Sequence, residues 1–170
     1  AEILRSKGFS HVLRIVGSGD SCNPKRVSPE EIESWKGPGV EILGRRSDIL
    51  RQMQEANLVV MPSYREGLPK VLLEAGLAER AVVTCDVPGC REVVKHGENG
   101  VLVPAQDAVA LSVAMEDLLS NEQLRKQYAS ANYKRVKTLF SSEVVNREML
   151  SLYRRLLEGG RGESRLIQCP

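Results

Sequence analysis

The chain has 170 residues, a length that fits a single domain. Hydrophobic residues make up 42% of it and charged residues 27%, which excludes a disordered chain, a collagen-like chain and a small disulfide-stapled protein. No apolar run approaches the roughly 18 residues of a membrane-spanning helix. Glu2, Arg5 and Lys7 interrupt the first residues and argue against a secretory signal there.

Basic side chains gather in the last third of the chain. Residues 1–120 carry 14 basic and 17 acidic side chains, whereas residues 121–170 carry 10 basic and 5 acidic ones, a net charge of +5. Such a segment can contact phosphates or an anionic membrane surface, or it can simply form solvated helix faces. Aromatic residues, at 4%, are too few for the stacking platforms of nucleic-acid-binding proteins.

The four cysteines form no Cys-x-x-Cys pair, and only two histidines accompany them. This combination provides no ligand set for zinc, so no metal site is expected. Free cysteines of this kind favour a reducing compartment and hence the cytoplasm.

Short apolar strands alternate with helices along most of the chain. Five segments have the length and composition of buried strands: Val12–Val16, Val40–Leu43, Leu58–Met61, Val82–Cys85 and Val101–Val103. Helical spacing or helix start signals occur over residues 29–35, 48–57 and 69–78, after Gly89, and over 108–119, 121–137 and 141–156.

This alternation predicts an α/β fold with a doubly wound parallel sheet, Rossmann-like, followed by C-terminal helices. The predicted domain covers residues 1–158, and residues 159–170, which have no periodicity, are predicted to be a disordered tail. Ser28 before Pro29, Asp48 and Asn121 are expected to cap helices. Ligands of such sheets bind beyond the carboxyl ends of the strands.

The segment Pro62–Glu74 joins a strand end to a helix start and carries the strongest functional pattern. Gly67 permits close approach of a ligand to the backbone, and Pro69 preorganises the first helical turn, where free N–H groups attract a phosphate. Glu66, in the loop, is placed to accept hydrogen bonds from sugar hydroxyls. Glu74 lies roughly 7–8 Å further along the helix, which suits another part of an extended ligand.

A purely structural role fits the same two carboxylates. An acidic residue near a helix N-terminus complements the helix dipole, and Glu74 can pair with Lys70 four residues earlier. Spacing alone leaves both interpretations open.

The pattern Glu66-x7-Glu74, within Pro62-Ser-Tyr-Arg-Glu-Gly-Leu-Pro-Lys-Val-Leu-Leu-Glu-Ala, resembles the signature of the family 4 retaining glycosyltransferases of the GT-B fold. The resemblance continues through Val82-Val-Thr-Cys-Asp-Val-Pro-Gly-Cys-Arg-Glu-Val-Val and Gly97-Glu-Asn-Gly-Val-Leu-Val-Pro. It extends from about Val12 to Leu157 and covers the C-terminal, donor-binding domain of such enzymes.

The resemblance implies roles for individual residues. Glu66 would be the catalytic-site carboxylate that contacts the donor sugar's hydroxyls, and Glu74 would hold the ribose hydroxyls. The amides of Gly67 and Leu68 would meet the diphosphate of a UDP- or GDP-linked sugar. No metal or other cofactor is required in the family.

Two further loops would border the base and ribose of the donor. These are the loop at Gly17 and the turn at Gly44 and Arg45. Glu79 and Ala81 stand where the family usually has a Gly and a Pro, in a position that shapes a turn.

The resemblance also indicates what this chain lacks. Family members open the domain with a strand, a loop bearing an Arg and a Lys for the donor phosphates, and a helix; the first strand and helix are expected to be truncated here. The N-terminal acceptor-binding domain is absent as well. We therefore expect donor binding from this chain, and catalysis only from a full-length protein.

The expected activity is transfer of a hexosyl unit from a nucleotide-diphosphate sugar to a glycan or lipid-linked acceptor in surface-polysaccharide biosynthesis. A cytoplasmic enzyme that touches the inner membrane face is expected, and the basic C-terminal third is compatible with this. One alternative is a GT-B-like nucleotide-sugar epimerase or hydrolase, which the lack of a well-placed catalytic histidine disfavours. Another is a nucleotide-sugar-binding module that works with a separate chain.

Three other side chains are weaker candidates. Arg65 can reach over a donor but is more typical of a solvated loop arginine. His96 has no carboxylate or serine partner nearby in sequence, and Cys90 has no paired histidine that would make it a nucleophile.

Overall fold

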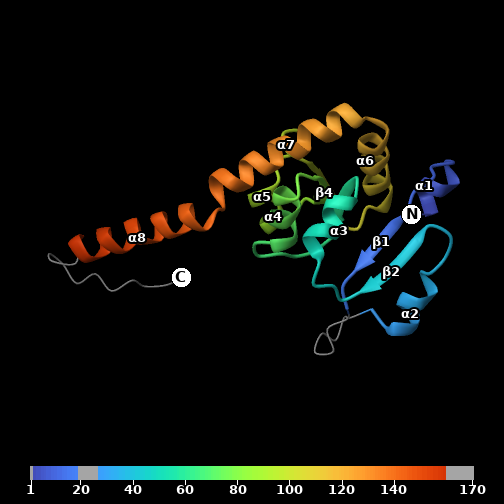
Figure 1. Cartoon of the computed structure of the whole chain (residues 1–170), viewed down its shortest axis with the longest axis horizontal. Coiled ribbons are helices and arrows are strands. Elements are labelled where there is room, and N and C mark those ends of the chain that lie inside the picture. The colour runs from blue at the N-terminus through green and yellow to red at the C-terminus, as the bar shows by residue number, and fades with distance from the viewer. Residues whose placement is uncertain (1, 19–26, 160–170) are drawn as a thin grey trace.

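The computed structural model describes residues 2–18 and 27–159 and contains five strands, which pair in parallel. They are β1 (Leu13–Val16), β2 (Val40–Gly44), β3 (Leu58–Met61), β4 (Ala81–Cys85) and β5 (Val101–Val103) (Figure 1). Each coincides with a segment predicted from sequence to within one residue at either end. The predicted parallel α/β class is therefore confirmed.

The strands are divided between two hydrogen-bonded sheets. β1 pairs with β2, and a separate three-stranded sheet has the order β3-β4-β5. In the larger sheet Met61 aligns with Thr84 and Cys85 aligns with Val103, so the three strands end at nearly the same level. Their carboxyl ends consequently form one edge.

Eight helices occur in the described part of the chain. They are α1 (Glu2–Ser6), α2 (Pro29–Ser34), α3 (Ile49–Glu55), α4 (Lys70–Leu77), α5 (Pro88–Val93), α6 (Ala108–Ser120), α7 (Glu122–Leu139) and α8 (Ser142–Gly159). Two of the three predicted caps are confirmed. Ser28 Oγ accepts a hydrogen bond from the Glu31 amide at 3.1 Å, and Asn121 Oδ1 accepts one from the Leu124 amide at 2.9 Å.

Asp48 precedes α3 as predicted, but its side chain makes no capping hydrogen bond. The Arg46 guanidinium instead donates to both carboxylate oxygens, at 2.8 Å each, and Gln52 donates at 3.1 Å. A bidentate, charge-assisted pair competes successfully with a single bond to a neutral amide.

The core is centred on β4, all five residues of which are buried. Because side chains alternate across a strand, Val82 packs with α4, α5 and α7, whereas Ala81 and Val83 pack with α6 and α7. Gly76 on α4 allows close packing against α7, since a Cβ there would meet Val136 Cγ2 at 2.5 Å.

A buried polar network ties α7 to this core. Asn99 Nδ2 donates to Asn132 Oδ1 at 3.0 Å, and Asn132 Nδ2 donates to the Arg80 carbonyl at 3.1 Å. Asn99 also bonds the backbone at Val93 and Lys95. Buried amides are stable in such a position only when they are paired.

α8 extends from the end of α7 away from both sheets (Figure 1). Its predicted apolar face exists, but side chains of that face such as Val145, Met149 and Leu152 remain 44–46% exposed. The tail predicted from residue 159 lies outside the described residues except for Gly159, the last residue of α8. Within residues 2–18 and 27–159, none of the helices combines the length and apolarity needed to cross a bilayer.

Candidate donor-binding site

The two predicted carboxylates lie in the loop that connects β3 to α4 (Glu66) and on α4 itself (Glu74). α4 begins at Lys70, one residue later than predicted, because Pro69 is still extended, with φ −73° and ψ 110°. Ser63 Oγ donates a hydrogen bond to Glu66 Oε1 at 2.7 Å, which fixes the half-buried Glu66 side chain. Gly67 and Leu68 are exposed at the start of the helix.

Gly89 supports this loop from the neighbouring element. A Cβ added at Gly89 would lie 2.1 Å from the Gly67 carbonyl oxygen and 2.4 Å from that of Glu66. The N-terminus of α5 therefore packs directly on the loop backbone, which only a glycine at this place allows. Gly89 is not among the site residues predicted from the sequence; its position after Pro88, beyond the end of a buried strand, is the signal that could have indicated it.

Glu74 lies on α4, one turn beyond the loop, and is half-buried. No salt bridge joins Glu74 to Lys70, so the alternative pairing considered from the sequence is not formed. The Glu74 carboxylate is therefore not engaged by Lys70.

The residues below the loop stabilise it and do not supply a nucleophile. Thr84 Oγ1 donates to the Met61 carbonyl at 2.8 Å and lies 3.2 Å from Cys90 Sγ. Burial raises the pKa of the Cys90 thiol, and it raises that of Cys85 in the same way. A thiol with a raised pKa is a poor nucleophile at neutral pH.

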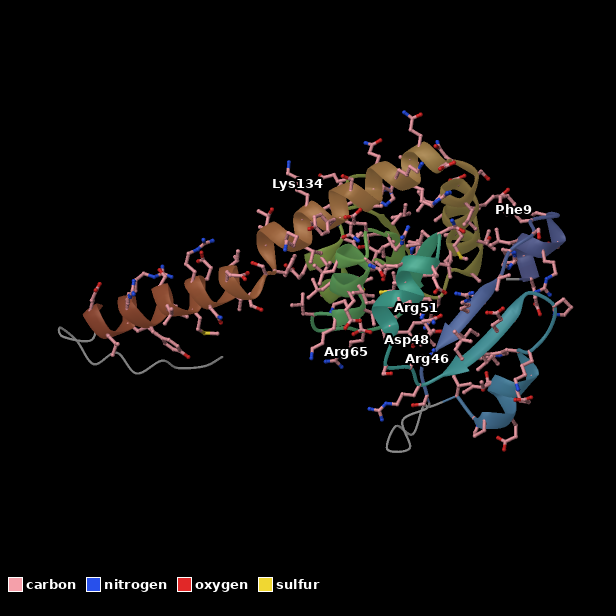
Figure 2. The ribbon with its side chains drawn as sticks, in the orientation of Figure 1. Phe9, Arg46, Asp48, Arg51, Arg65 and Lys134 are labelled. Carbon is pink, nitrogen blue, oxygen red and sulfur yellow. The ribbon has the colours of Figure 1, made fainter. Side chains whose placement is uncertain are left out.

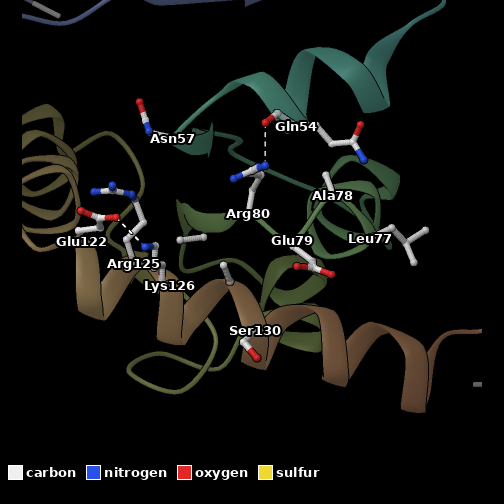
Figure 3. Close-up of a pocket in the computed structure, with 12 residues that line it drawn as sticks. Gln54, Asn57, Leu77, Ala78, Glu79, Arg80, Glu122, Arg125, Lys126 and Ser130 are labelled. Carbon is white, nitrogen blue, oxygen red and sulfur yellow. Dashed lines mark hydrogen bonds and ion pairs between the residues drawn. The ribbon is translucent and has the colours of Figure 1, made fainter.

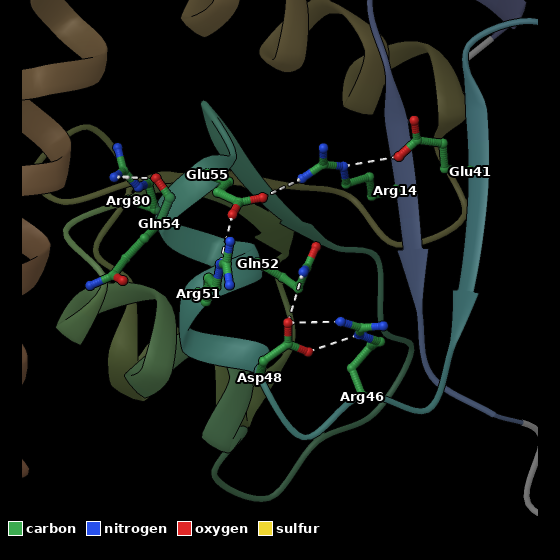
Figure 4. A network of polar contacts seen from close by, with 9 residues as sticks. All are labelled: Arg14, Glu41, Arg46, Asp48, Arg51, Gln52, Gln54, Glu55 and Arg80. Atoms are coloured by element: carbon green, nitrogen blue, oxygen red, sulfur yellow. Dashed lines mark hydrogen bonds and ion pairs between the residues drawn. The ribbon is translucent and has the colours of Figure 1, made fainter.

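The loops after β1 and β2 lie side by side. The Gly17 amide donates to the Gly44 carbonyl at 2.9 Å, and Gly44 has a φ of 63°, which favours glycine. Arg45 is exposed next to them. Arg46, in contrast, is held by Asp48, and its guanidinium keeps the pKa of that carboxyl well below the usual range (Figure 4).

Arginine–carboxylate contacts join the small sheet to α3. Arg14 on β1 donates to Glu41 on β2 at 3.0 Å and to Glu55 on α3 at 3.1 Å, and Glu55 also accepts from Arg51 at 3.0 Å (Figure 4). These contacts are exposed, so they orient the elements more than they stabilise them.

The weaker sequence candidates have structural or solvated positions. Arg65 is exposed in the β3–α4 loop (Figure 2). His96 Nδ1 accepts a hydrogen bond from the Leu102 amide at 3.2 Å, which assigns this ring to the turn before β5. Arg91 forms an ion pair with Asp86 after β4 and lowers the pKa of that carboxyl.

Comparison with known proteins identifies the family of the chain. Residues 1–121 match the family model described as "Glycosyl transferases group 1". The capsular polysaccharide biosynthesis glycosyltransferase CapM of Staphylococcus aureus is 31% identical over 162 residues, which cover 95% of this chain and 42% of CapM. A Campylobacter jejuni N,N'-diacetylbacillosaminyl-diphospho-undecaprenol α-1,3-N-acetylgalactosaminyltransferase is 33% identical over 144 residues, 85% of this chain and 37% of that enzyme.

Solved structures share the fold. Sucrose-phosphate synthase from Thermosynechococcus elongatus matches with a TM-score of 0.76 and 29% identity, over 86% of this chain and 39% of the synthase. Anabaena HepE, solved in complex with UDP-glucose, matches with a TM-score of 0.74 and 23% identity, over 85% of this chain and 41% of HepE. The chain thus spans about two fifths of the length of these proteins. With this fold and a family match over most of its length, the chain belongs to the group 1 glycosyltransferases and corresponds to the C-terminal part of a GT-B enzyme.

Proposed function

We propose that this chain is the nucleotide-sugar-binding half of a retaining glycosyltransferase. The full-length enzyme would transfer a hexosyl unit from a nucleotide-diphosphate sugar to a glycan or lipid-linked acceptor. The observation that carries the proposal is the β3–α4 loop, in which Ser63 fixes Glu66 and Gly89 supports the loop backbone, next to an α4 start with free amides.

The donor's diphosphate would bind at the start of α4. Gly67 and Leu68 are exposed and directly precede α4, whose N-terminal end carries the positive end of the helix dipole and stabilises an anion. The sugar would contact Glu66 on one side of the phosphates, and the ribose hydroxyls would contact Glu74 on the other. Backbone amides and cationic side chains would then stabilise the charge that develops on the leaving diphosphate, with no metal required.

The base would lie toward the small sheet. Gly17 and Gly44, which are hydrogen-bonded to each other and have no side chains, would let the base lie close to the backbone. The exposed Arg45 would contact the ribose or a phosphate. The binding of UDP-glucose by HepE, which has the same fold, supports a nucleotide-sugar as the ligand.

The relatives support a proposal for the acceptor and the cellular setting. The Campylobacter enzyme acts on a sugar linked to diphospho-undecaprenol, and CapM acts in capsule biosynthesis. We expect a cytoplasmic enzyme that meets its acceptor at the inner membrane face, with a separate acceptor-binding domain. This chain alone is expected to bind the donor and to be catalytically inactive.

The ribose contact is the most direct test. Calorimetric titration of the chain with UDP-glucose and a GDP-sugar should show weak binding that Glu74→Ala reduces by roughly 10- to 100-fold, the value of hydrogen bonds to a charged group. Glu98→Ala, an exposed change in the turn before β5, is the matched control and should leave the affinity unchanged. Equal affinities for the Glu74→Ala variant and the original chain would overturn the assignment.

A further inference from the structure

A pocket lies at the end of β4 opposite to the candidate donor site. It has a volume of about 650 Å³ and is formed by Ala81, the first residue of β4, by the C-terminal ends of α3 and α4, and by the first half of α7 (Figure 3). Four residues further along β4, roughly 13 Å away, the strand ends at the donor-site edge. Its lining contains the basic residues Arg80, Arg125 and Lys126, the acidic residues Glu79 and Glu122, and the neutral polar residues Gln54, Asn57 and Ser130.

Arg80 is directed into this pocket by the way α4 ends. Glu79 adopts a left-handed φ of 55°, and the Arg80 amide bonds the Ala75 carbonyl at 2.9 Å, which together form a Schellman C-cap. Asn132 holds the Arg80 carbonyl from α7. The backbone of Arg80 is thus fixed on both sides.

The Arg80 guanidinium is only partly satisfied. Nη2 donates to the Gln54 carbonyl at 2.7 Å, whereas Nε is buried and lacks an acceptor among the described residues. The other terminal nitrogen points into the space between Asn57 and Arg125 (Figure 3). A buried N–H group without an acceptor raises the free energy of the folded chain. Binding of a ligand that supplies acceptors for the Arg80 guanidinium would therefore be favoured.

Two further cations line the same space. Arg125 Nη1 donates to the Leu118 and Leu119 carbonyls at 2.9 and 3.1 Å, and Lys126 pairs with Glu122 at 2.7 Å. The pocket lining therefore contains three positive and two negative side chains, since Glu79 and Glu122 also belong to it, and its net formal charge is +1. Like charges that face one cavity repel each other, and an anion between them removes this repulsion.

We propose that this pocket binds a small phosphate-bearing anion, at a site distinct from the donor site. Guanidinium groups match the geometry of phosphate oxygens, and the amides of Gln54 and Asn57 and the Ser130 hydroxyl supply neutral hydrogen-bonding groups around them. The volume is in the range of small-molecule sites and exceeds a bare phosphate, so the ligand class is a phosphate ester or a diphosphate with a polar organic group.

The test is a titration of the chain with pyrophosphate and with inorganic phosphate at constant ionic strength, followed by amide chemical shifts in NMR spectra. Saturable shifts are expected at Asn57, Arg80 and Ser130. Shifts confined to Gly67 and Leu68 would place the anion at the donor site and overturn the proposal. No shift up to about 10 mM ligand would overturn it as well.

Variants that change the charge of the pocket should change the affinity for pyrophosphate in opposite directions. Lys126→Gln should weaken pyrophosphate binding roughly 3- to 5-fold, and Glu122→Gln should strengthen it by a similar factor, the size of an exposed charge interaction. Both residues are exposed, so the fold should tolerate both changes. Lys134→Gln, two turns further along α7 and outside the pocket lining, is the matched control. The proposal would be contradicted if the Lys126 and Glu122 variants bound pyrophosphate with the same affinity as the Lys134 variant.

Discussion

Single residues position the candidate donor site through the backbone as much as through side chains. Gly89 touches the carbonyls of Glu66 and Gly67, and Ser63 holds the Glu66 carboxylate. These contacts come from residues on either side of the loop and leave it little freedom. A loop held in this way presents its amides in one arrangement before a ligand binds, which lowers the ordering cost of binding.

Gly89→Ala should therefore disturb both the loop and donor binding. The new Cβ cannot be accommodated against rigid backbone carbonyls, so the loop must shift; we expect about 1–3 kcal/mol of destabilisation, typical of overpacking. Urea denaturation measures the stability, and calorimetry with UDP-glucose measures the affinity, which should fall.

Gly67→Ala is the control for stability in the same loop. A Cβ at Gly67 would meet nothing within 4 Å, and its φ lies outside the left-handed range. This change should alter the free energy of unfolding by less than about 0.5 kcal/mol. If the two variants were equally stable, the close packing at Gly89 would not have the assigned importance.

The residue that follows the C-terminal end of α4 has a backbone conformation that its residue type does not favour. Glu79 occupies the left-handed position of the C-cap, where glycine is preferred. The glycine that the family resemblance leads us to expect here would adopt this φ without strain. Arg80 follows in the cap and lines the pocket between α3, α4 and α7.

Glu79→Gly should stabilise the chain. A left-handed backbone conformation costs a non-glycine residue about 1–2 kcal/mol. Glycine avoids this strain but loses more conformational entropy on folding, which reduces the gain. We expect the free energy of unfolding to rise by about 0.5–1 kcal/mol. Thermal and urea unfolding measure it. Glu79→Ala removes the same charge but keeps the strained backbone, and a gain of equal size in that variant would refute the explanation.

At the scale of the whole molecule, the two sheets differ in burial. Every residue of β4 is buried, whereas no residue of β1 or β2 is. Parallel sheets normally have both faces covered, and a two-stranded sheet is marginal by itself. Exposed ion pairs such as Arg14–Glu55 connect the small sheet to α3 and add little stability.

We expect hydrogen exchange to follow this difference. After correction for intrinsic rates, amides of β4 should exchange at least about 10-fold more slowly than those of β1 and β2, because the latter open without unfolding of the core. Peptide-level mass spectrometry resolves the two sheets. Comparable protection in both would mean that the chain unfolds as one cooperative unit.

The free edges of β1 and β3 have a further consequence for the whole protein. Among the described strands, β1 has only β2 as a neighbour and β3 has only β4. A parallel strand between them would join the two sheets and cover the exposed backbone groups. The truncated first strand of the domain stays a prediction, and these two edges are where such a strand can pair.

Local patterns were sufficient to predict most of the fold. β-branched runs located all five strands, and Ser28 and Asn121 marked helix starts, because strand length and capping depend on residues close in sequence. Asp48 was predicted incorrectly as a side-chain cap, because its competing partner Arg46 forms a stronger bidentate pair.

The sequence by itself determined the fold class, the family, and the loop and helix that carry Glu66 and Glu74, since these depend on periodicity and on a contiguous motif. The tertiary structure alone decided that Gly89 supports this loop, that the strands separate into two sheets, and that Arg80 and Lys126 share a pocket. Each of these depends on contacts between elements far apart along the chain. Such contacts are fixed by packing in three dimensions, for which a linear pattern contains no direct signal.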